Sequence, residues 1–126
     1  GQKQLAQELL KSDMMVYPPH DFRETYGIAF LEAQAAGCLV FYRQNGALGE
    51  TVGNRGIPIS MDATPEQVVA TIVSTLESKE RCDIIKERAM KYGMARDWSL
   101  QVDKMLRLYR SIEHDSTYRT DKINST

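Results

Sequence analysis

Two glutamates, Glu24 and Glu32, are separated by seven residues, and Gly27 lies between them. Carboxylates accept hydrogen bonds from hydroxyl groups, and the N-terminus of a helix offers backbone N–H groups to an anion. Because Gly27 has no Cβ, a phosphate could approach closely the N–H groups of Tyr26, Gly27 and Ile28. An anion site between two carboxylates that accept bonds from hydroxyls suits a nucleotide sugar.

A helix expected at residues 26–36 must position these groups, and nearly all of its residues are apolar or small. A helix that is apolar all round is a buried one. We therefore expect Glu32 to be buried and to need donors, since an uncompensated buried carboxylate costs on the order of several kcal/mol. Plainer interpretations stay open: Glu24 caps the helix, Glu32 lies on a partly exposed face, and Gly27 eases a turn.

The segments around this helix form the pattern of a βαβ unit. A short apolar run at 14–17 ends at two prolines, and a second run at 38–42 follows Gly37. A third expected strand, 56–60, contains Pro58, which favours an edge position because proline cannot donate to the ladder. The pattern predicts an α/β fold with a Rossmann-like parallel sheet of about three strands and flanking helices. In such sheets ligands bind at the carboxyl edge of the strands.

The remaining helices are expected at residues 2–11, 64–76, 79–92 and 99–112, with a single turn at 47–52. Thr64, Pro65 and Gln67 predict a helix start with a capping box.

The last helix is expected to be capped by Ser99, with Trp98 packing as an anchor before it. The residues expected to point inward are Val102, Met105, Leu106 and Tyr109. Residues 113–126 are polar and lack periodicity, so we expect a disordered tail after a domain at 1–112.

Length and composition exclude several classes of function. The 126 residues suffice for one domain, and the formal net charge of -1 gives no basic field for nucleic acid. No apolar run approaches the roughly 20 residues of a membrane span, and no signal peptide is seen. Cys38 and Cys82 lack metal-ligand or disulfide spacing, which indicates a reducing, cytoplasmic setting, and we expect no metal or cofactor. A buried Cys38 is a poor candidate for a nucleophile.

A longer motif runs through this region: Glu24-Thr25-Tyr26-Gly27-Ile28, Glu32-Ala33-Gln34-Ala35-Ala36-Gly37, Val40 and Gly46-Ala47-Leu48-Gly49-Glu50-Thr51-Val52. It resembles the retaining glycosyltransferases of family 4, nucleotide-sugar enzymes of the GT-B fold. Their signature is two glutamates separated by seven residues and followed by Ala and Gly. Departures are Pro19 where Ser is usual, Leu39 where Pro is usual, and Ala47 where a second glycine is more common.

The resemblance implies a role for each matching residue. Glu24 would contact hydroxyls of the donor sugar and be the catalytic residue, and Glu32 would accept bonds from the ribose. The N–H groups of Tyr26, Gly27 and Ile28 would bind the diphosphate and sugar. The Gly46-Ala47 loop would lie close to the sugar and phosphate, and no metal is needed.

Only the later half of the C-terminal, donor-binding domain is matched. The acceptor domain, which would admit a glycan, a lipid or another hydroxyl compound, is missing, as is the basic pair that normally meets the diphosphate. We therefore expect a fragment or module that is inactive alone. Two alternatives stay open: a non-catalytic assembly module that self-associates through an open sheet edge, or another GT-B nucleotide-sugar enzyme such as an epimerase.

Overall fold

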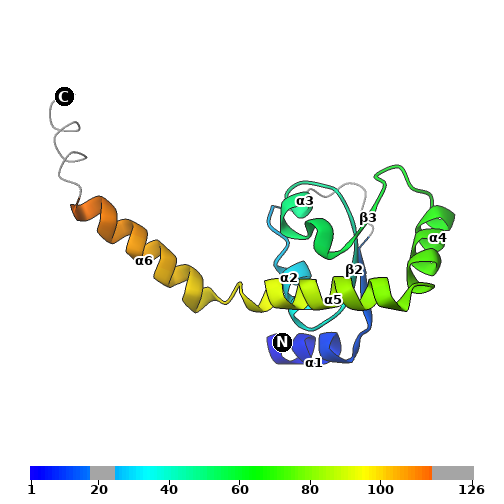
Figure 1. Ribbon diagram of the computed structural model, residues 1–126, viewed down its shortest axis with the longest axis horizontal. Helices are drawn as coiled ribbons and strands as arrows, with labels where there is room; N and C mark the ends of the chain where they lie inside the picture. The colour runs from blue at the N-terminus through cyan, green and yellow to red at the C-terminus, as the bar shows by residue number, and fades with distance from the viewer. Residues whose placement is uncertain (18–24, 115–126) are drawn as a thin grey trace. The chain divides into compact units, whose positions relative to one another are not determined.

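The computed structural model describes residues 1–17 and 25–114 (Figure 1). The chain divides into two compact units, Gly1–Met94 and Ala95–Thr126. The first unit holds the sheet with its helices, and the second contains one described helix. All described residues predicted to bind the donor therefore belong to the first unit.

The sheet has three parallel strands in the order β1-β2-β3. They are β1 Met14–Tyr17, β2 Leu39–Arg43 and β3 Ile57–Ile59. Met14 pairs with Leu39, and Phe41 pairs with Ile57. The predicted α/β, Rossmann-like architecture is confirmed, and Pro58 lies on an edge strand as expected.

The helices are α1 Gln2–Lys11, α2 Ile28–Ala35, α3 Leu48–Thr51, the 3₁₀ helix η1 Gly53–Arg55, α4 Pro65–Leu76, α5 Lys79–Met94 and α6 Trp98–His114. Apart from η1, which was not predicted, their ends lie within two residues of the predicted ones, the usual uncertainty of helix ends. The capping box at Thr64 and Gln67 is present in full. None of the helices in the described part of the chain has the length and apolar character to cross a membrane.

Strand β2 is buried on both faces, as expected of a central strand in a parallel sheet. Leu39 and Phe41 belong to one core cluster, together with Ile57, Ile59 and residues of α4 and α5. Val40 and Tyr42 belong to a second cluster, which α2 and α3 complete. Alternate side chains of β2 therefore belong to different core clusters, and each cluster packs the sheet against its own set of helices.

Helix α2 is not buried all round, and this prediction was wrong. It packs against β2 and α5, which bury Phe30, Leu31, Ala33 and Gln34. Its remaining side is open: Ile28 is 51% exposed, and Glu32 is exposed as well. Helix α1 covers that side only in part and leaves a cleft beside Glu32, so the apolar pattern overstated the burial.

The apolar stripe of α6 is exposed, and the prediction that it points inward was wrong. Trp98, the expected anchor, is 71% exposed. The residues predicted to point inward, Val102, Met105, Leu106 and Tyr109, are all exposed as well. The second unit offers no other described element on which this helix could pack.

The helix cap also differs from the prediction. The N–H and the hydroxyl of Ser99 both donate to the carboxylate of Asp97, the N–H at 2.7 Å. The carbonyl of Asp97 accepts from the N–H of Gln101. Asp97 is therefore the capping residue, and Ser99 lies inside the first turn.

Candidate functional site

Gly27 forms the N-terminal cap of α2 in a left-handed backbone conformation, with φ 80° and ψ 51°. An L residue with a side chain is strained there, which explains the glycine. Gly27 has no side chain to cap the helix, and the first turn contains no acidic residue. The partial positive charge of this helix end is therefore not offset by a side chain of the cap or first turn.

The structure brings the segment at Gly27 together with the segment that follows β2. The hydroxyl of Thr51, in α3, donates to the carbonyl of Tyr26 at 2.7 Å. Gly46 takes a positive φ of 60°, and Ala47 leads directly into α3. The two segments follow the carboxyl ends of neighbouring parallel strands, so the predicted residues Tyr26, Gly27, Gly46 and Ala47 lie at one edge of the sheet.

The side chain of Arg55 links η1 to α3. Its guanidinium donates to the carbonyls of Glu50, at 3.0 Å, and Thr51, at 2.9 Å. The same group lies over the ring of Tyr92 in α5, 3.6 Å from the ring centroid. Arg55 thereby ties the loop after β2 to α5, a role that the sequence analysis missed because nothing near Arg55 indicates its distant partner.

The polar residue buried in α2 is Gln34, not Glu32. Gln34 is fully buried, and its amide donates to the carbonyl of Arg55 at 3.1 Å. The amide therefore links α2 to η1. Both residues interrupt the apolar pattern of the helix, but the prediction of a buried polar group concerned Glu32 and was wrong.

Glu32 faces a cleft of about 290 Å³ between α1 and α2. Apolar side chains of α1, among them Leu5 and Leu9, line the other wall. The described residues supply no hydrogen-bond or ion-pair partner to its carboxylate. The expectation of a buried, hydrogen-bonded Glu32 is corrected: its carboxylate is exposed and available to a ligand.

The predicted catalytic residue, Glu24, lies outside the described residues, as does the loop from Pro18 that carries it. Its predicted role therefore stays a prediction.

A buried arginine, Arg43, shapes the same edge of the sheet from the end of β2. It is 3% exposed, and its guanidinium donates to the carbonyls of Ser60 at 3.0 Å and Ala63 at 2.9 Å, and also to that of Met61. Carbonyls thus accept hydrogen bonds from both terminal nitrogens of a charge that would be costly to bury without partners, while its Nε has no partner among the described residues. Arg43 therefore holds the loop between β3 and α4 in place through these hydrogen bonds.

Cys38 has the properties of a structural thiol. It is fully buried, and its Sγ lies 3.3 Å from the carbonyls of Leu9 and Ser12, to which it donates. Burial raises the pKa of the Cys38 thiol, so the reactive thiolate is disfavoured. Within residues 1–17 and 25–114 no group of three or more His, Cys, Asp or Glu side chains could hold a metal ion.

Comparison with known proteins identifies a family and a relative. Residues 1–92 match the family described as "Glycosyl transferases group 1". The chain is also 28% identical over 109 residues to a protein of Segniliparus rotundus named D-inositol 3-phosphate glycosyltransferase. That match covers 86% of this chain and 24% of the relative, so the chain spans about a quarter of the length of this curated relative.

Proposed function

The chain belongs to the group 1 glycosyl transferases, and on that premise we propose that it forms part of the donor-binding site of a retaining, family 4 enzyme. The enzyme would transfer a sugar from a nucleotide diphospho-sugar to an acceptor hydroxyl. The observation that carries the proposal is the Thr51–Tyr26 hydrogen bond, which holds the Gly27 end of α2 beside the loop at Gly46 and Ala47. Two backbone segments suited to an anion thus meet at one edge of the sheet.

In this proposal the Gly27 end of α2 binds the diphosphate. The backbone N–H groups of Tyr26, Gly27 and Ile28 stabilise the charge that develops as the diphosphate departs. The Gly46-Ala47 loop contacts the sugar and phosphate from the opposite side. Glu24 contacts hydroxyls of the sugar and is the proposed catalytic residue.

In this proposal Glu32 accepts hydrogen bonds from the ribose, and its carboxylate is exposed before the ligand binds. Its exposed carboxylate has no partner among the described residues, so its hydrogen-bonding capacity is free for ribose hydroxyls. A bound nucleoside would cover it and reduce its contact with water, which strengthens hydrogen bonds to a charged acceptor.

The acceptor, whether a glycan, a lipid or another hydroxyl compound, would bind to parts of a longer, cytoplasmic protein. The chain spans 24% of its relative, which supports a division of labour in which this part holds the donor and is inactive alone. The alternatives are a non-catalytic assembly module and a GT-B epimerase, and product analysis would identify the epimerase.

Calorimetric titration with uridine, guanosine and adenosine diphosphates tests the donor site. We expect saturable binding that weakens at least roughly tenfold in Glu32→Ala, because each hydrogen bond to a charged group is worth about 1.5–3 kcal/mol. Glu77→Ala, which removes another exposed carboxylate at the end of α4, is the matched control and should bind as the parent does. Absence of binding at millimolar nucleotide, or equal weakening in both variants, would contradict the proposal and favour the assembly module.

A further inference from the structure

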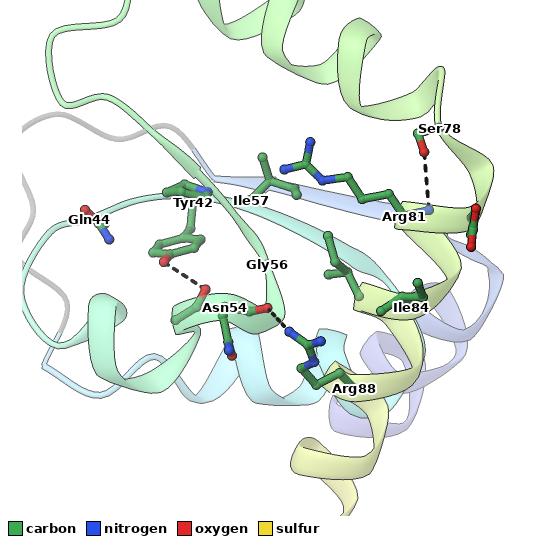
Figure 2. Close-up of a pocket in the computed structure, with 13 residues that line it drawn as sticks. Tyr42, Gln44, Asn54, Gly56, Ile57, Ser78, Arg81, Ile84 and Arg88 are labelled. Carbon is green, nitrogen blue, oxygen red and sulfur yellow. Dashed lines mark hydrogen bonds between the residues drawn. The ribbon is translucent and has the colours of Figure 1, made fainter.

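A groove of about 700 Å³ lies between η1 with the adjoining start of β3 and residues 80–88 of α5 (Figure 2). β3 is the last strand in the sheet order, so one of its edges pairs with no strand among the described residues. The opposite wall of the groove comes from α5. We call this surface the edge groove; it plays no part in the proposed donor site.

One face of α5 carries a basic, apolar, basic sequence toward the edge groove. Arg81, Ile84 and Arg88 stand at positions i, i+3 and i+7, so they share a side of the helix. Figure 2 shows these three side chains along the α5 wall. Ile84 is 49% exposed, so an apolar surface lies open between two guanidinium groups.

The two arginines have little to neutralise them within the described part of the chain. No described residue pairs with the guanidinium of Arg81, and Arg88 reaches only the carbonyl of Asn54, at 3.5 Å. The strand-side wall carries no charged side chain, and Glu80 is the acidic residue among those that line the groove. The positive charge on the α5 wall is therefore largely available to an acidic ligand.

The geometry favours an extended segment of chain over a small molecule. The two arginines are seven positions apart, which is about 10 Å along the helix axis. Their long side chains can reach two carboxylates about four residues, or roughly 13 Å, apart on one side of an extended chain. The α5 wall is open to solvent, whereas small-molecule pockets enclose most of their ligand. Pro58 has no N–H to extend a ladder, so binding must rest on side chains more than on an added strand.

We propose that the edge groove binds an extended acidic peptide segment of a partner protein. Two carboxylates of that segment, about four residues apart and on the same side of the extended chain, pair with Arg81 and Arg88. An apolar side chain between them packs on Ile84. Side-chain charge and spacing, more than main-chain pairing, select the partner.

The probe is a fluorescein-labelled peptide with two glutamates about four residues apart and a leucine midway between them, so that the three side chains share one side of the extended chain. Fluorescence anisotropy measures its binding to the full chain. We expect saturable binding that weakens roughly tenfold or more in Arg81→Glu, because charge reversal replaces attraction with repulsion. Arg107→Glu, on exposed α6, changes net charge equally and should bind as the parent does. A peptide with glutamines in place of the glutamates should not bind.

A charge swap keeps the proposal testable if one variant folds poorly. The double variant Arg81→Glu/Arg88→Glu should bind a peptide with lysines in place of the two glutamates, and circular dichroism checks that it is folded. Absence of saturable binding by the acidic peptide, or equal weakening in Arg107→Glu, overturns the proposal. Displacement of the peptide by inorganic phosphate, but not by chloride at equal ionic strength, also overturns it, because the groove is then a small-anion site.

Discussion

Gly56 lies where the backbone of η1 passes into β3, and its position leaves no space for a side chain. A Cβ there would lie 2.5 Å from Cγ1 of Val52 and 2.8 Å from the carbonyl oxygen of Val40. The second atom belongs to the backbone of a central strand and cannot move freely. We therefore expect Gly56→Ala to lower the free energy of unfolding by about 1–3 kcal/mol, measured by urea denaturation.

Gly49→Ala is the matched control, because nothing lies within 4 Å of the Cβ that it would add. Alanine is also the better helix former, so α3 should tolerate it. Equal destabilisation by both substitutions would show that the close packing at Gly56 does not determine the cost.

Arg43 provides a second test at the scale of one residue. Arg43→Met keeps an apolar side chain of similar reach but removes the donors to Ser60, Met61 and Ala63. Buried carbonyls that lose their donors cost about 1–3 kcal/mol, and we expect a loss of this size in urea denaturation. Arg107→Met, at an exposed position of α6, should change stability by less than about 0.5 kcal/mol. An Arg43 variant as stable as the parent would show that these hydrogen bonds do not stabilise the fold.

The two polar residues of α2 show what a pattern of residue types can predict. The apolar context predicted a buried, hydrogen-bonded Glu32, which was wrong; the buried polar residue of the helix is Gln34, whose amide nitrogen donates to the carbonyl of Arg55. Glu32 lies on the side that faces the α1 cleft. Choosing between them requires knowing which side the sheet and α5 cover, and this information lies in distant segments.

Among the elements, α6 carries a cap whose strength depends on pH. The hydrogen bond from the Ser99 hydroxyl lowers the pKa of the Asp97 carboxyl most, and the hydrogen bond from the Ser99 N–H lowers it further. Because the folded pKa is lowered, the cap stabilises the helix above the ordinary carboxyl pKa. That contribution is lost as pH falls through the lowered value.

We therefore expect the first turn of α6 to fray in acid. The backbone amides of Ser99 and Gln101, observed by NMR, should lose protection from hydrogen exchange between neutral pH and roughly pH 2. Asp97→Asn can still accept the hydrogen bond but does not titrate, so its first turn should vary less with pH. Equal fraying of Asp97→Asn over that range would place the titrating group elsewhere.

Element positions were largely predictable because their signals are local. Thr64, Pro65 and Gln67 specify the start of α4 through contacts within one turn. Burial was less predictable, because an apolar stripe shows that a helix has an apolar side but not whether another element covers it. In α6 that stripe is exposed, since no described element of its unit covers it.

At the scale of the whole molecule, the fold class followed from the order of short apolar runs, glycines and one apolar helix. Parallel pairing required only that β1, α2 and β2 follow one another in sequence. The sequence did not predict the division at Met94 and Ala95. That division depends on which helices share a core, and α6 has the same apolar periodicity as a core helix.

The core clusters predict how the molecule responds to truncation. Both clusters lie within the first unit, and none of their buried residues follows Ile85. A chain that ends at Met94 should therefore unfold cooperatively, with a free energy within roughly 0.5 kcal/mol of the full chain. Urea denaturation followed by circular dichroism measures this difference.

A chain that ends at Leu76 is the control, because it loses α5 and with it Cys82 and Ile85 of the first cluster. Without α5, the surfaces of β2 and α2 that α5 covers become exposed to water, so cooperative unfolding should disappear. If the chain ending at Met94 instead lost more than about 2 kcal/mol, the exposed stripe of α6 would have to stabilise the first unit. The division into two units would then not describe the folded chain.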